Sequence, residues 1–468
     1  MYNQNKLDTA KNYQEWLAIA KTLDAETGKL AWREDNTSKL FHHQLLQEDL
    51  LLMQKYRSRK HGAKLLDIIL ESLPRHFWEL NNPQLYTQAL SGTKYIIDEY
   101  MQEVEKSLRY IGDNHIPGLS DKKKLNLFSE GNRIHGNTVL MLSGGASFGI
   151  YHLGVVKALW QEKLLPQIIS GSSMGAIVAA SICTKTDAEL EVFFQNLQTV
   201  HRVALQMYAP QQIFENTSVM DPEQLLEHIQ ANVGGNYTFL EAYQKTGRIL
   251  NVSVSATRKR QKPKVLNYLT APNLLIEQSI LASCAIPGIF APVTLKAKDR
   301  TGRIVPYMKS EQWIDGSVHL DVPMQRIIRL HNVSRSVVSQ ANPHVIPFVS
   351  GDEKHNLFTF LGDMAFATLQ AQVLKMLDIS SELSEKLTWL SFLEKIRSML
   401  EQEYHGDINI SYPMTLESIF RIAANPSEEE FWDFIRKGEQ ATWPKISFIR
   451  NQLFLNQVLE DCIGKLQG

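Results

Sequence analysis

The five residues from Gly171 to Gly175 constrain the fold more than any other stretch, because they join a strand-like segment directly to a helix-like one. Ile168 and Ile169 precede a Gly-x-Ser-x-Gly pentapeptide centred on Ser173, and small and branched apolar residues follow it. A strand that turns straight into a helix brings two backbones together, so side chains at both glycine positions would collide. The serine of such an elbow is exposed near a helix N-terminus, where backbone N–H groups favour negative charge. Alone, the pentapeptide is equally compatible with a simple tight turn.

A second glycine-containing turn, Ser143–Gly149, follows the apolar strand predicted at Thr138–Leu142 and opens a predicted helix. Gly144 and Gly145 let successive backbone N–H groups, together with that of Ala146, point into one concavity that suits an oxyanion. A nucleotide phosphate loop fits poorly, because the turn has neither the Lys-Ser/Thr pair of a Walker loop nor a Gly-x-Gly-x-x-Gly pattern. The turn therefore supplies a candidate oxyanion hole, which a serine nucleophile needs in addition to a base.

The base itself has one strong candidate, the carboxylate of Asp315. Trp313 and Ile314 form the end of an apolar predicted strand, and Asp315 and Gly316 follow it. An Asp-Gly pair is usually only a turn. Here the strand before it, and its position after the pentapeptide, favour a carboxylate that acts on Ser173.

The spacing of apolar residues changes twice along the chain. The pattern from Asn12 to about Ile111 predicts helices, including one that begins with a capping box at Asn12. The polar segment from Asp121 to Gly136 is the best candidate for a domain boundary. Between residues 136 and 350, strands alternate with helices, which predicts a doubly wound, mostly parallel α/β sheet covered on both faces. Helices dominate again from 351 to 468. We therefore expect a helical N-terminal accessory domain at 1–135, an α/β domain with the motifs above at 136–350, and a helical C-terminal region at 351–468.

Several segments carry more specific expectations. A helix near Ala63–Leu73 is expected to stop before Pro74. The apolar stretch Leu357–Met376 is predicted to be a buried helix, with a membrane-docking surface as the alternative. The strands expected after the pentapeptide are Ile249–Ala256, Val265–Tyr268, Val293–Lys296, Gln312–Ile314 and Arg335–Ser339.

Composition excludes several classes of protein. The 468 residues carry a net charge of −1, so no excess of basic charge indicates binding of nucleic acid. The three cysteines lack metal or disulfide spacing, which indicates buried thiols in a reducing compartment, and no metal is expected. The N-terminus has no apolar signal-peptide core, and no stretch approaches the ~18 apolar residues of a membrane-spanning helix. We expect a cytoplasmic protein, or one attached peripherally to a membrane or lipid droplet.

Together, the motifs resemble the patatin-like phospholipase family. That family has a Gly-Gly-Gly-x-Arg/Lys-Gly loop, a Gly-x-Ser-x-Gly elbow and an Asp-Gly-Gly or Asp-Gly-Ala element. This chain differs at Ala146, Phe148 and Ser317, and these departures, like His152, are typical of the family's triacylglycerol-lipase branch. The further segments that are similar to this branch are Ala31–Arg33, Leu85–Tyr86, Asn267–Asn273, Leu281–Gly288, Gln340–Val345 and Gly438–Lys445.

The resemblance implies a lipase or phospholipase that uses a Ser–Asp dyad without histidine. Ser173 would be the nucleophile and Asp315 the proton acceptor, and the N–H groups of Gly144, Gly145 and Ala146 would form the oxyanion hole. An aspartate has a reference pKa of about 3.9, so the dyad must rely on a close Ser–Asp hydrogen bond and strong oxyanion stabilisation. The residues implied to support the site are Gly171 and Gly175 of the elbow, and Gly149, Gly316 and His152.

The implied substrate is an acylglycerol or a phospholipid at the surface of a membrane or lipid droplet, and no cofactor is implied. The loop from Arg258 to Lys264 carries five cations. Arg258, Lys259 and Arg260 are predicted to contact an anionic membrane, with a merely solvated loop as an equally good interpretation.

Three alternatives stay open. A Ser–Asp–His triad has the required chain order if His319, His331 or His344 is the base. Acyl transfer to an acceptor other than water, such as a lysophospholipid, would use the same dyad. An inactive relative that only binds lipid is disfavoured by the presence of both Ser173 and Asp315.

Overall fold

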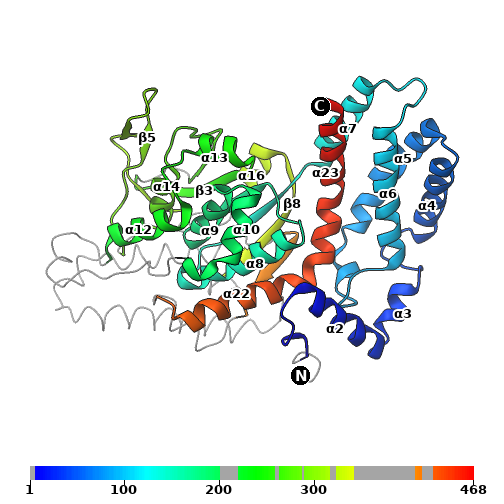
Figure 1. Ribbon diagram of the computed structural model, residues 1–468, viewed down its shortest axis with the longest axis horizontal. Helices are drawn as coiled ribbons and strands as arrows, with labels where there is room; N and C mark the ends of the chain where they lie inside the picture. The colour runs from blue at the N-terminus through cyan, green and yellow to red at the C-terminus, as the bar shows by residue number, and fades with distance from the viewer. Residues whose placement is uncertain are drawn as a thin grey trace.

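A seven-stranded sheet organises the middle of the chain (Figure 1). The computed structural model describes residues 6–200, 220–258, 263–286, 289–316, 323–341, 406–413 and 425–468. The strands are β1 (Asn137–Leu142), β2 (Ile168–Gly171), β3 (Ile249–Ala256), β4 (Lys264–Leu266), β7 (Trp313–Asp315), β8 (Val333–Gln340) and β9 (Ile408–Ser411). They lie in the order β4-β3-β2-β1-β8-β9, with β7 also paired to β3. The central pairs are parallel, and β4 and β7 run antiparallel to β3, so the predicted mostly parallel sheet is confirmed.

Side chains alternate between two apolar layers, as expected for a sheet with both faces covered. In β1, Leu140 and Leu142 point into the larger core, whereas Val139 and Met141 point into a smaller one with Ile327. Helices α8 (Tyr151–Gln161), α9 (Met174–Cys183) and α14 (Ile276–Ser283) contribute to the larger core, and α16 (Met324–His331) to the smaller one. The predicted doubly wound α/β fold is thereby confirmed.

The remaining helices and strands of this part lie around the sheet. The helices are η2 (Ala146–Ile150), α10 (Asp187–Gln195), η3 (Leu197–Thr199), α12 (Pro222–Val233) and α13 (Phe239–Thr246). A separate two-stranded hairpin consists of β5 (Lys296–Lys298) and β6 (Ile304–Pro306). The expected strand Val293–Lys296 is wrong in its bounds, because Val293 makes only an isolated bridge with Trp313. Neither β6 nor β9 was predicted.

The N-terminal part is helical, as predicted. Its helices are α2 (Tyr13–Glu26), α3 (Lys29–Glu34), α4 (His43–Ser58), α5 (Gly62–Leu80), η1 (Pro83–Tyr86), α6 (Tyr95–Asp113) and α7 (Asp121–His135). The Asn12 side chain caps α2 by accepting from the backbone N–H of Glu15. The predicted end before Pro74 is wrong, since α5 continues through it to Leu80. A proline removes one intrahelical hydrogen bond, and the packing of α5 against α4 and α6 maintains the rest of the helix.

Two C-terminal helices connect the helical part to the sheet. Helix α22 (Glu428–Thr442) packs on α8, and after η4 (Trp443–Lys445) helix α23 (Ile446–Gln467) packs on α6 and α7. Figure 1 shows α23 standing between the N-terminal helices and the α/β layers. The Arg450 guanidinium pairs with Glu162 of the α/β part at 2.9 Å, and Lys465 pairs with Asp113 of α6 at 3.0 Å.

The domain boundaries stay predictions, although α7 does end at His135 and β1 begins at Asn137. Among the described helices, none combines the length and apolar character needed to cross a membrane. The sequence-based predictions for Lys259, Arg260, Ser317, His319, His344 and Leu357–Met376 lie outside the described residues.

Candidate active site

The predicted elbow is a sharp turn between β2 and α9, with Ser173 immediately before the helix. Ser173 has φ 52° and ψ −125°, a conformation that is costly for a residue with a side chain and that is found mainly at functional sites. A Cβ atom on Gly171 would lie 2.3 Å from the Gly175 carbonyl oxygen, and one on Gly175 would lie 2.4 Å from that of Leu142. Only glycine fits at either position, which is the mechanical role predicted for both.

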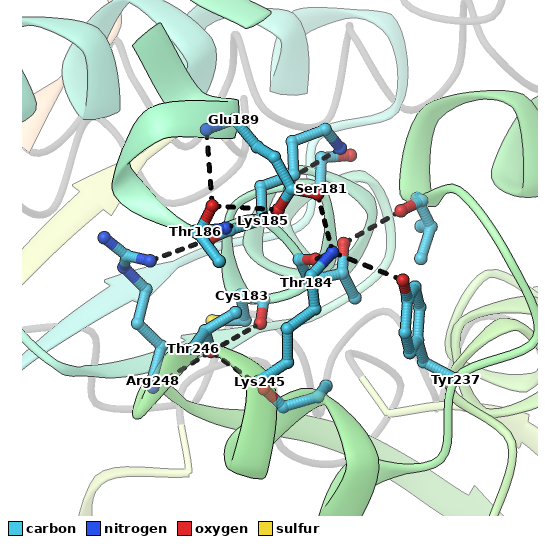
Figure 2. A network of polar contacts seen from close by, with 12 residues as sticks. Ser181, Cys183, Thr184, Lys185, Thr186, Glu189, Tyr237, Lys245, Thr246 and Arg248 are labelled. Atoms are coloured by element: carbon cyan, nitrogen blue, oxygen red, sulfur yellow. Dashed lines mark hydrogen bonds and ion pairs between the residues drawn. The ribbon is translucent and has the colours of Figure 1, made fainter.

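The opposite end of α9 is held by basic side chains (Figure 2). Lys185, Lys245 and Arg248 donate to the main-chain carbonyls of Ser181, Thr184 and Lys185, at 2.9, 3.1 and 2.8 Å, respectively. Burial lowers the pKa of Lys185 to about 8. Cations at a helix C-terminus offset the negative end of the helix dipole. Ser173 precedes the opposite, positive end of α9, the end that favours negative charge.

The glycine turn after β1 lies directly against the elbow. Gly145 has φ 152°, and a Cβ atom there would lie 2.9 Å from the Ala341 carbonyl oxygen. Ala146 has φ 45°, a left-handed conformation that costs an alanine more than it would cost a glycine. A Cβ atom on Gly149 would lie 2.3 Å from Cγ of Met174, the residue after Ser173. These contacts bring the two glycine-containing turns together.

Phe148, which replaces the family's basic residue, anchors the turn through aromatic contacts. Its side chain is buried and stacks on Tyr412 with ring centroids 5.3 Å apart. The Phe434 ring of α22 meets it edge-on at 5.7 Å. Such ring pairs are favourable beyond the area that they bury. In this chain, the loop is held by apolar packing against C-terminal residues in place of a charge.

His152 supports the same turn from beneath. It is fully buried, with Nε2 2.9 Å from the Ser143 carbonyl oxygen and Nδ1 2.7 Å from the Ser339 hydroxyl. Burial lowers the pKa of His152 to about 4, so the ring is neutral at physiological pH. Nε2–H then donates to the carbonyl while Nδ1 accepts from the hydroxyl. Both ring nitrogens are engaged between β1 and β8, which fits a structural role and not proton transfer.

Asp315 lies beside the elbow because of how β7 joins the sheet. Strand β2 pairs with β3 from Ile249 to Val252, and β4 pairs with the opposite edge of β3 from Val252 to Val254. Since Val254 also pairs with Asp315, β7 must take the edge that β2 leaves when it turns at Gly171. Asp315 is fully buried, and its backbone N–H donates to the Ala285 carbonyl oxygen at 3.0 Å.

Two residues with no predicted role connect Ser173 to Asp315. The Ser283 hydroxyl accepts from the backbone N–H of Ser173 at 3.0 Å and donates to the Ser253 carbonyl oxygen at 2.8 Å. A Cβ atom on Gly316 would lie 2.4 Å from that same oxygen, which explains the glycine after Asp315. The Cys284 thiol interacts with the Ser173 side chain, and burial together with the charge of Asp315 raises its pKa. The only signal for Ser283 and Cys284 in the sequence is the family-like segment Leu281–Gly288.

A cavity of about 90 Å³ opens at Ser173. Ala146, Ser147 and Cys284 line it together with Ser173, so the glycine turn and the elbow face one space. Apolar side chains from η2 and from helices α8, α9, α10, α12 and α22 form most of its wall: Ile150, Leu153, Ile177, Phe193, Leu225 and Phe431. Such a wall suits a hydrocarbon chain whose ester lies at Ser173.

Of the three histidines of the alternative triad, the structure describes His331, which is not among the residues that line the cavity at Ser173. The His331 Nε2 atom lies 2.9 Å from Oδ1 of Asn251, whose side chain also accepts from Asn267. His228 of α12, which the sequence analysis did not single out, does line the cavity. Within the described ranges, no group of three or more His, Cys, Asp or Glu side chains is arranged to hold a metal ion.

Two family models match the helical N-terminal part and the α/β part of the chain. Residues 2–133 match a domain of unknown function (DUF3336), and residues 140–327 match the family described as patatin-like phospholipase. Triacylglycerol lipase SDP1L of Arabidopsis thaliana is 35% identical over 481 residues, which cover 99% of this chain and 58% of that protein. Triacylglycerol lipase 4 of Saccharomyces cerevisiae is 34% identical, over 98% of this chain and 52% of that protein. The chain thus spans little more than half of these two relatives.

Triacylglycerol lipase ptl3 of Schizosaccharomyces pombe is 33% identical over 461 residues, which cover 95% of this chain and 94% of that protein. Among solved structures, VipD from Legionella pneumophila matches with a TM-score of 0.29 and 14% identity, over 70% of this chain and 67% of that one. The predicted family is confirmed by the relatives of known sequence: the chain belongs to the patatin-like phospholipase family.

Proposed function

We propose that this protein is a serine acyl-ester hydrolase that releases fatty acids from acylglycerols or phospholipids. Ser173 is the nucleophile, Asp315 accepts its proton, and the N–H groups of Gly144, Gly145 and Ala146 hold the oxyanion. The observation that carries the proposal is that the strained Ser173 and the turn at Ala146 line one cavity, while β7 lies beside the elbow.

In this mechanism, the Ser173 hydroxyl attacks the ester carbonyl while its proton passes to the Asp315 carboxylate. Negative charge then develops on the carbonyl oxygen, close to the N-terminus of α9 and the glycine turn. Each such backbone donor is typically worth roughly 3–4 kcal/mol to the transition state. Protonated Asp315 returns its proton to the leaving alkoxide, and water then hydrolyses the acyl-enzyme to release the fatty acid.

The apolar cavity supports an acyl group as the part of the substrate that is recognised. Helix α9 contributes Ile177 and Ser181 to the wall, one and two turns beyond Ser173. At a rise of about 1.5 Å per residue, the distance from Ser173 to Ser181 along α9 is about 12 Å. A chain that follows this wall would lie with its ester at the glycine turn and its terminus toward the basic side chains of Figure 2.

The three relatives named above are called triacylglycerol lipases, which favours an acylglycerol as substrate. Such a substrate resides at a lipid surface, so we also propose that the protein acts while attached to one. Of the predicted membrane contacts, Arg258 is described, and its guanidinium lies 3.3 Å from Glu311 and donates to the Ser310 carbonyl oxygen at 3.0 Å.

A panel of acyl-labelled triacylglycerol, diacylglycerol, phospholipid and lysophospholipid tests the proposal. We expect release of labelled fatty acid from at least one ester by the unchanged chain and none by Ser173→Ala. The control Ser129→Ala removes an exposed serine of α7 in the N-terminal part and should act like the unchanged chain.

Each panel reaction is repeated with unlabelled lysophospholipid present. Label that moves to the lysophospholipid instead of free fatty acid would identify an acyltransferase with the same dyad. Hydrolysis that persists in Ser173→Ala, or no turnover of any ester by the unchanged chain, would overturn the proposal.

A further inference from the structure

The hairpin formed by β5 and β6 projects from the α/β part at the end remote from the N-terminal helices (Figure 1). Strand β5 is tied to the body, because its Lys298 N–H donates to the Asn273 carbonyl oxygen at 2.9 Å. Among the strands that the structure describes, β6 pairs with β5 alone and forms the outer edge of the hairpin. All three residues of β6 are exposed. The hairpin therefore presents a free edge away from the rest of the molecule.

The tip of the hairpin is rigid despite its exposure. The Asp299 carboxylate accepts from the backbone N–H groups of Thr301 and Arg303, at 2.8 and 3.0 Å, and from the Thr301 hydroxyl at 2.6 Å. Its second oxygen accepts from Nε of Arg303 at 3.1 Å. These hydrogen bonds, Thr301 foremost, lower the pKa of Asp299, so the carboxylate keeps them at neutral pH. A rigid tip can bind a surface without first losing conformational freedom.

Large apolar side chains on this hairpin face solvent. The exposed fractions are 49% for Ile304, 37% for Val305 and 43% for Met308. Three such residues within five positions expose more apolar surface than a single residue does, which marks this part of the chain for interaction. Exposed apolar side chains on a protruding hairpin are able to enter the boundary between lipid headgroups and acyl chains.

Basic side chains surround these apolar residues. Residues 296–311 hold five basic and two acidic residues, although the whole chain has a net charge of −1. Lys298 pairs with Glu241 and Arg303 with Asp299. Among the described residues, no carboxylate lies within ion-pair distance of Lys296, Arg300 or Lys309. These three exposed cations are therefore available to bind an anionic partner.

From these observations we propose that the β5–β6 hairpin docks the protein on an anionic lipid surface, with Ile304, Val305 and Met308 inserted and Lys296, Arg300 and Lys309 at the headgroups. This inference rests on the proposed action on lipid esters. Pro306 favours lipid over an added protein strand, because a proline on an edge strand cannot donate a ladder hydrogen bond. Arg258 contacts Ser310 at the base of the hairpin, so the cation predicted from the sequence lies beside the same surface.

Binding to vesicles tests the docking surface directly. Vesicles of phosphatidylcholine with phosphatidylserine are co-sedimented with the Ser173→Ala chain, which keeps the lipid intact. Each Lys or Arg near an anionic surface contributes about fivefold to partition, so Arg300→Gln/Lys309→Gln should lower binding about 25-fold. Ile304→Ser/Met308→Ser should lower it by a similar factor, and on pure phosphatidylcholine as well.

Matched controls carry the same substitutions far from the hairpin. Lys21→Gln/Lys122→Gln removes two exposed cations, and Leu51→Ser/Leu70→Ser removes two half-exposed leucines, of the N-terminal helices. Both controls should bind vesicles like the parent. Hairpin variants that bind as well as the parent, or controls that lose binding equally, would overturn the proposal.

A soluble short-chain ester separates this proposal from the proposed function. In the background with Ser173 intact, the hairpin variants should hydrolyse it at the unchanged rate, because the hairpin is not part of the cavity. No hydrolysis by the unchanged chain would refute the proposed function and leave the vesicle result standing. If hydrolysis is normal and the hairpin variants bind vesicles as well as the parent, the docking surface alone would be refuted.

Discussion

The crossing of α8 and α22 at Gly154 and Gly438 predicts a severe effect of one added methyl group. A Cβ atom on Gly154 would lie 1.9 Å from the Ile435 carbonyl oxygen, and one on Gly438 would lie 2.2 Å from that of Tyr151. Both obstacles are backbone atoms, so no side-chain rotation can relieve the overlap. Gly154→Ala therefore requires α22 to move by about 1 Å, since such atoms do not approach within ~3 Å.

The cost can be estimated from what α22 contributes. Overpacking a well-packed site typically costs about 1–3 kcal/mol, and a backbone-to-backbone clash belongs at the upper end. The displacement would also loosen the ring contact between Phe148 and Phe434 and the Lys157–Glu439 ion pair of 2.7 Å. We expect Gly154→Ala to lower the free energy of unfolding by roughly 3 kcal/mol. Activity should fall as well, because Phe431 of α22 lines the cavity.

Urea unfolding followed by circular dichroism measures this effect, and Gly464→Ala is the matched control. A Cβ atom on Gly464, within α23, would meet nothing within 4 Å. The control should therefore raise the free energy of unfolding by roughly 0.5–1 kcal/mol, the difference between alanine and glycine inside a helix. Equal stability of Gly154→Ala and the unchanged chain would refute the close crossing of α8 and α22.

Three further predictions concern the site and its surroundings. Burial lowers the pKa of His152 to about 4 and that of His135 to about 2, so the unfolded chain binds more protons than the folded chain below pH 6.5. The free energy of unfolding should therefore drop by about 2 kcal/mol per histidine from pH 7 to pH 5, and a urea midpoint that does not change with pH would contradict this. Gly145→Ala should lower kcat/KM about 10²-fold or more by displacing the oxyanion turn. Ala146→Gly should keep activity and change the free energy of unfolding by no more than about 1 kcal/mol, and equal rates for both variants would refute the role of the turn. Burial and the charge of Asp315 raise the pKa of Cys284, so iodoacetamide at pH 8 should alkylate this thiol far more slowly than an exposed one and leave activity intact. Rapid inactivation with alkylated Cys284 would argue against a buried thiol beside Asp315.

The local parts of this structure could be predicted from the sequence. Glycines at 171 and 175 leave few options for a chain that passes from strand to helix, and the elbow has that form. Strand β3 matches its predicted bounds of Ile249–Ala256: Ile249, Val252 and Val254 are β-prone, and seven of its eight residues are buried. The polar segment from Asp121 was expected to separate two domains, yet it forms α7. Its few apolar residues suffice because α23, more than 300 residues later, packs against it.

The parts that could not be predicted depend on contacts between residues far apart in the sequence. Phe148 appears in the sequence only as a departure from a family pattern, and its role depends on Tyr412 and Phe434. Strand β9 has only four residues, and its place in the sheet is decided by pairing with β8. Ser283 and Cys284 belong to α14 and the residue after it, and only the fold brings them to Ser173.

Covalent labelling with a fluorophosphonate, followed by peptide mapping, tests the Ser173–Asp315 dyad most directly. The account predicts one labelled residue, Ser173, with the labelling rate reduced about 10²-fold or more in Asp315→Asn and nearly unchanged in His228→Ala and His331→Ala. His228 is included because it lines the same cavity. Label on another residue, or Asp315→Asn labelled at the unchanged rate while a histidine variant fails, would contradict the central claim.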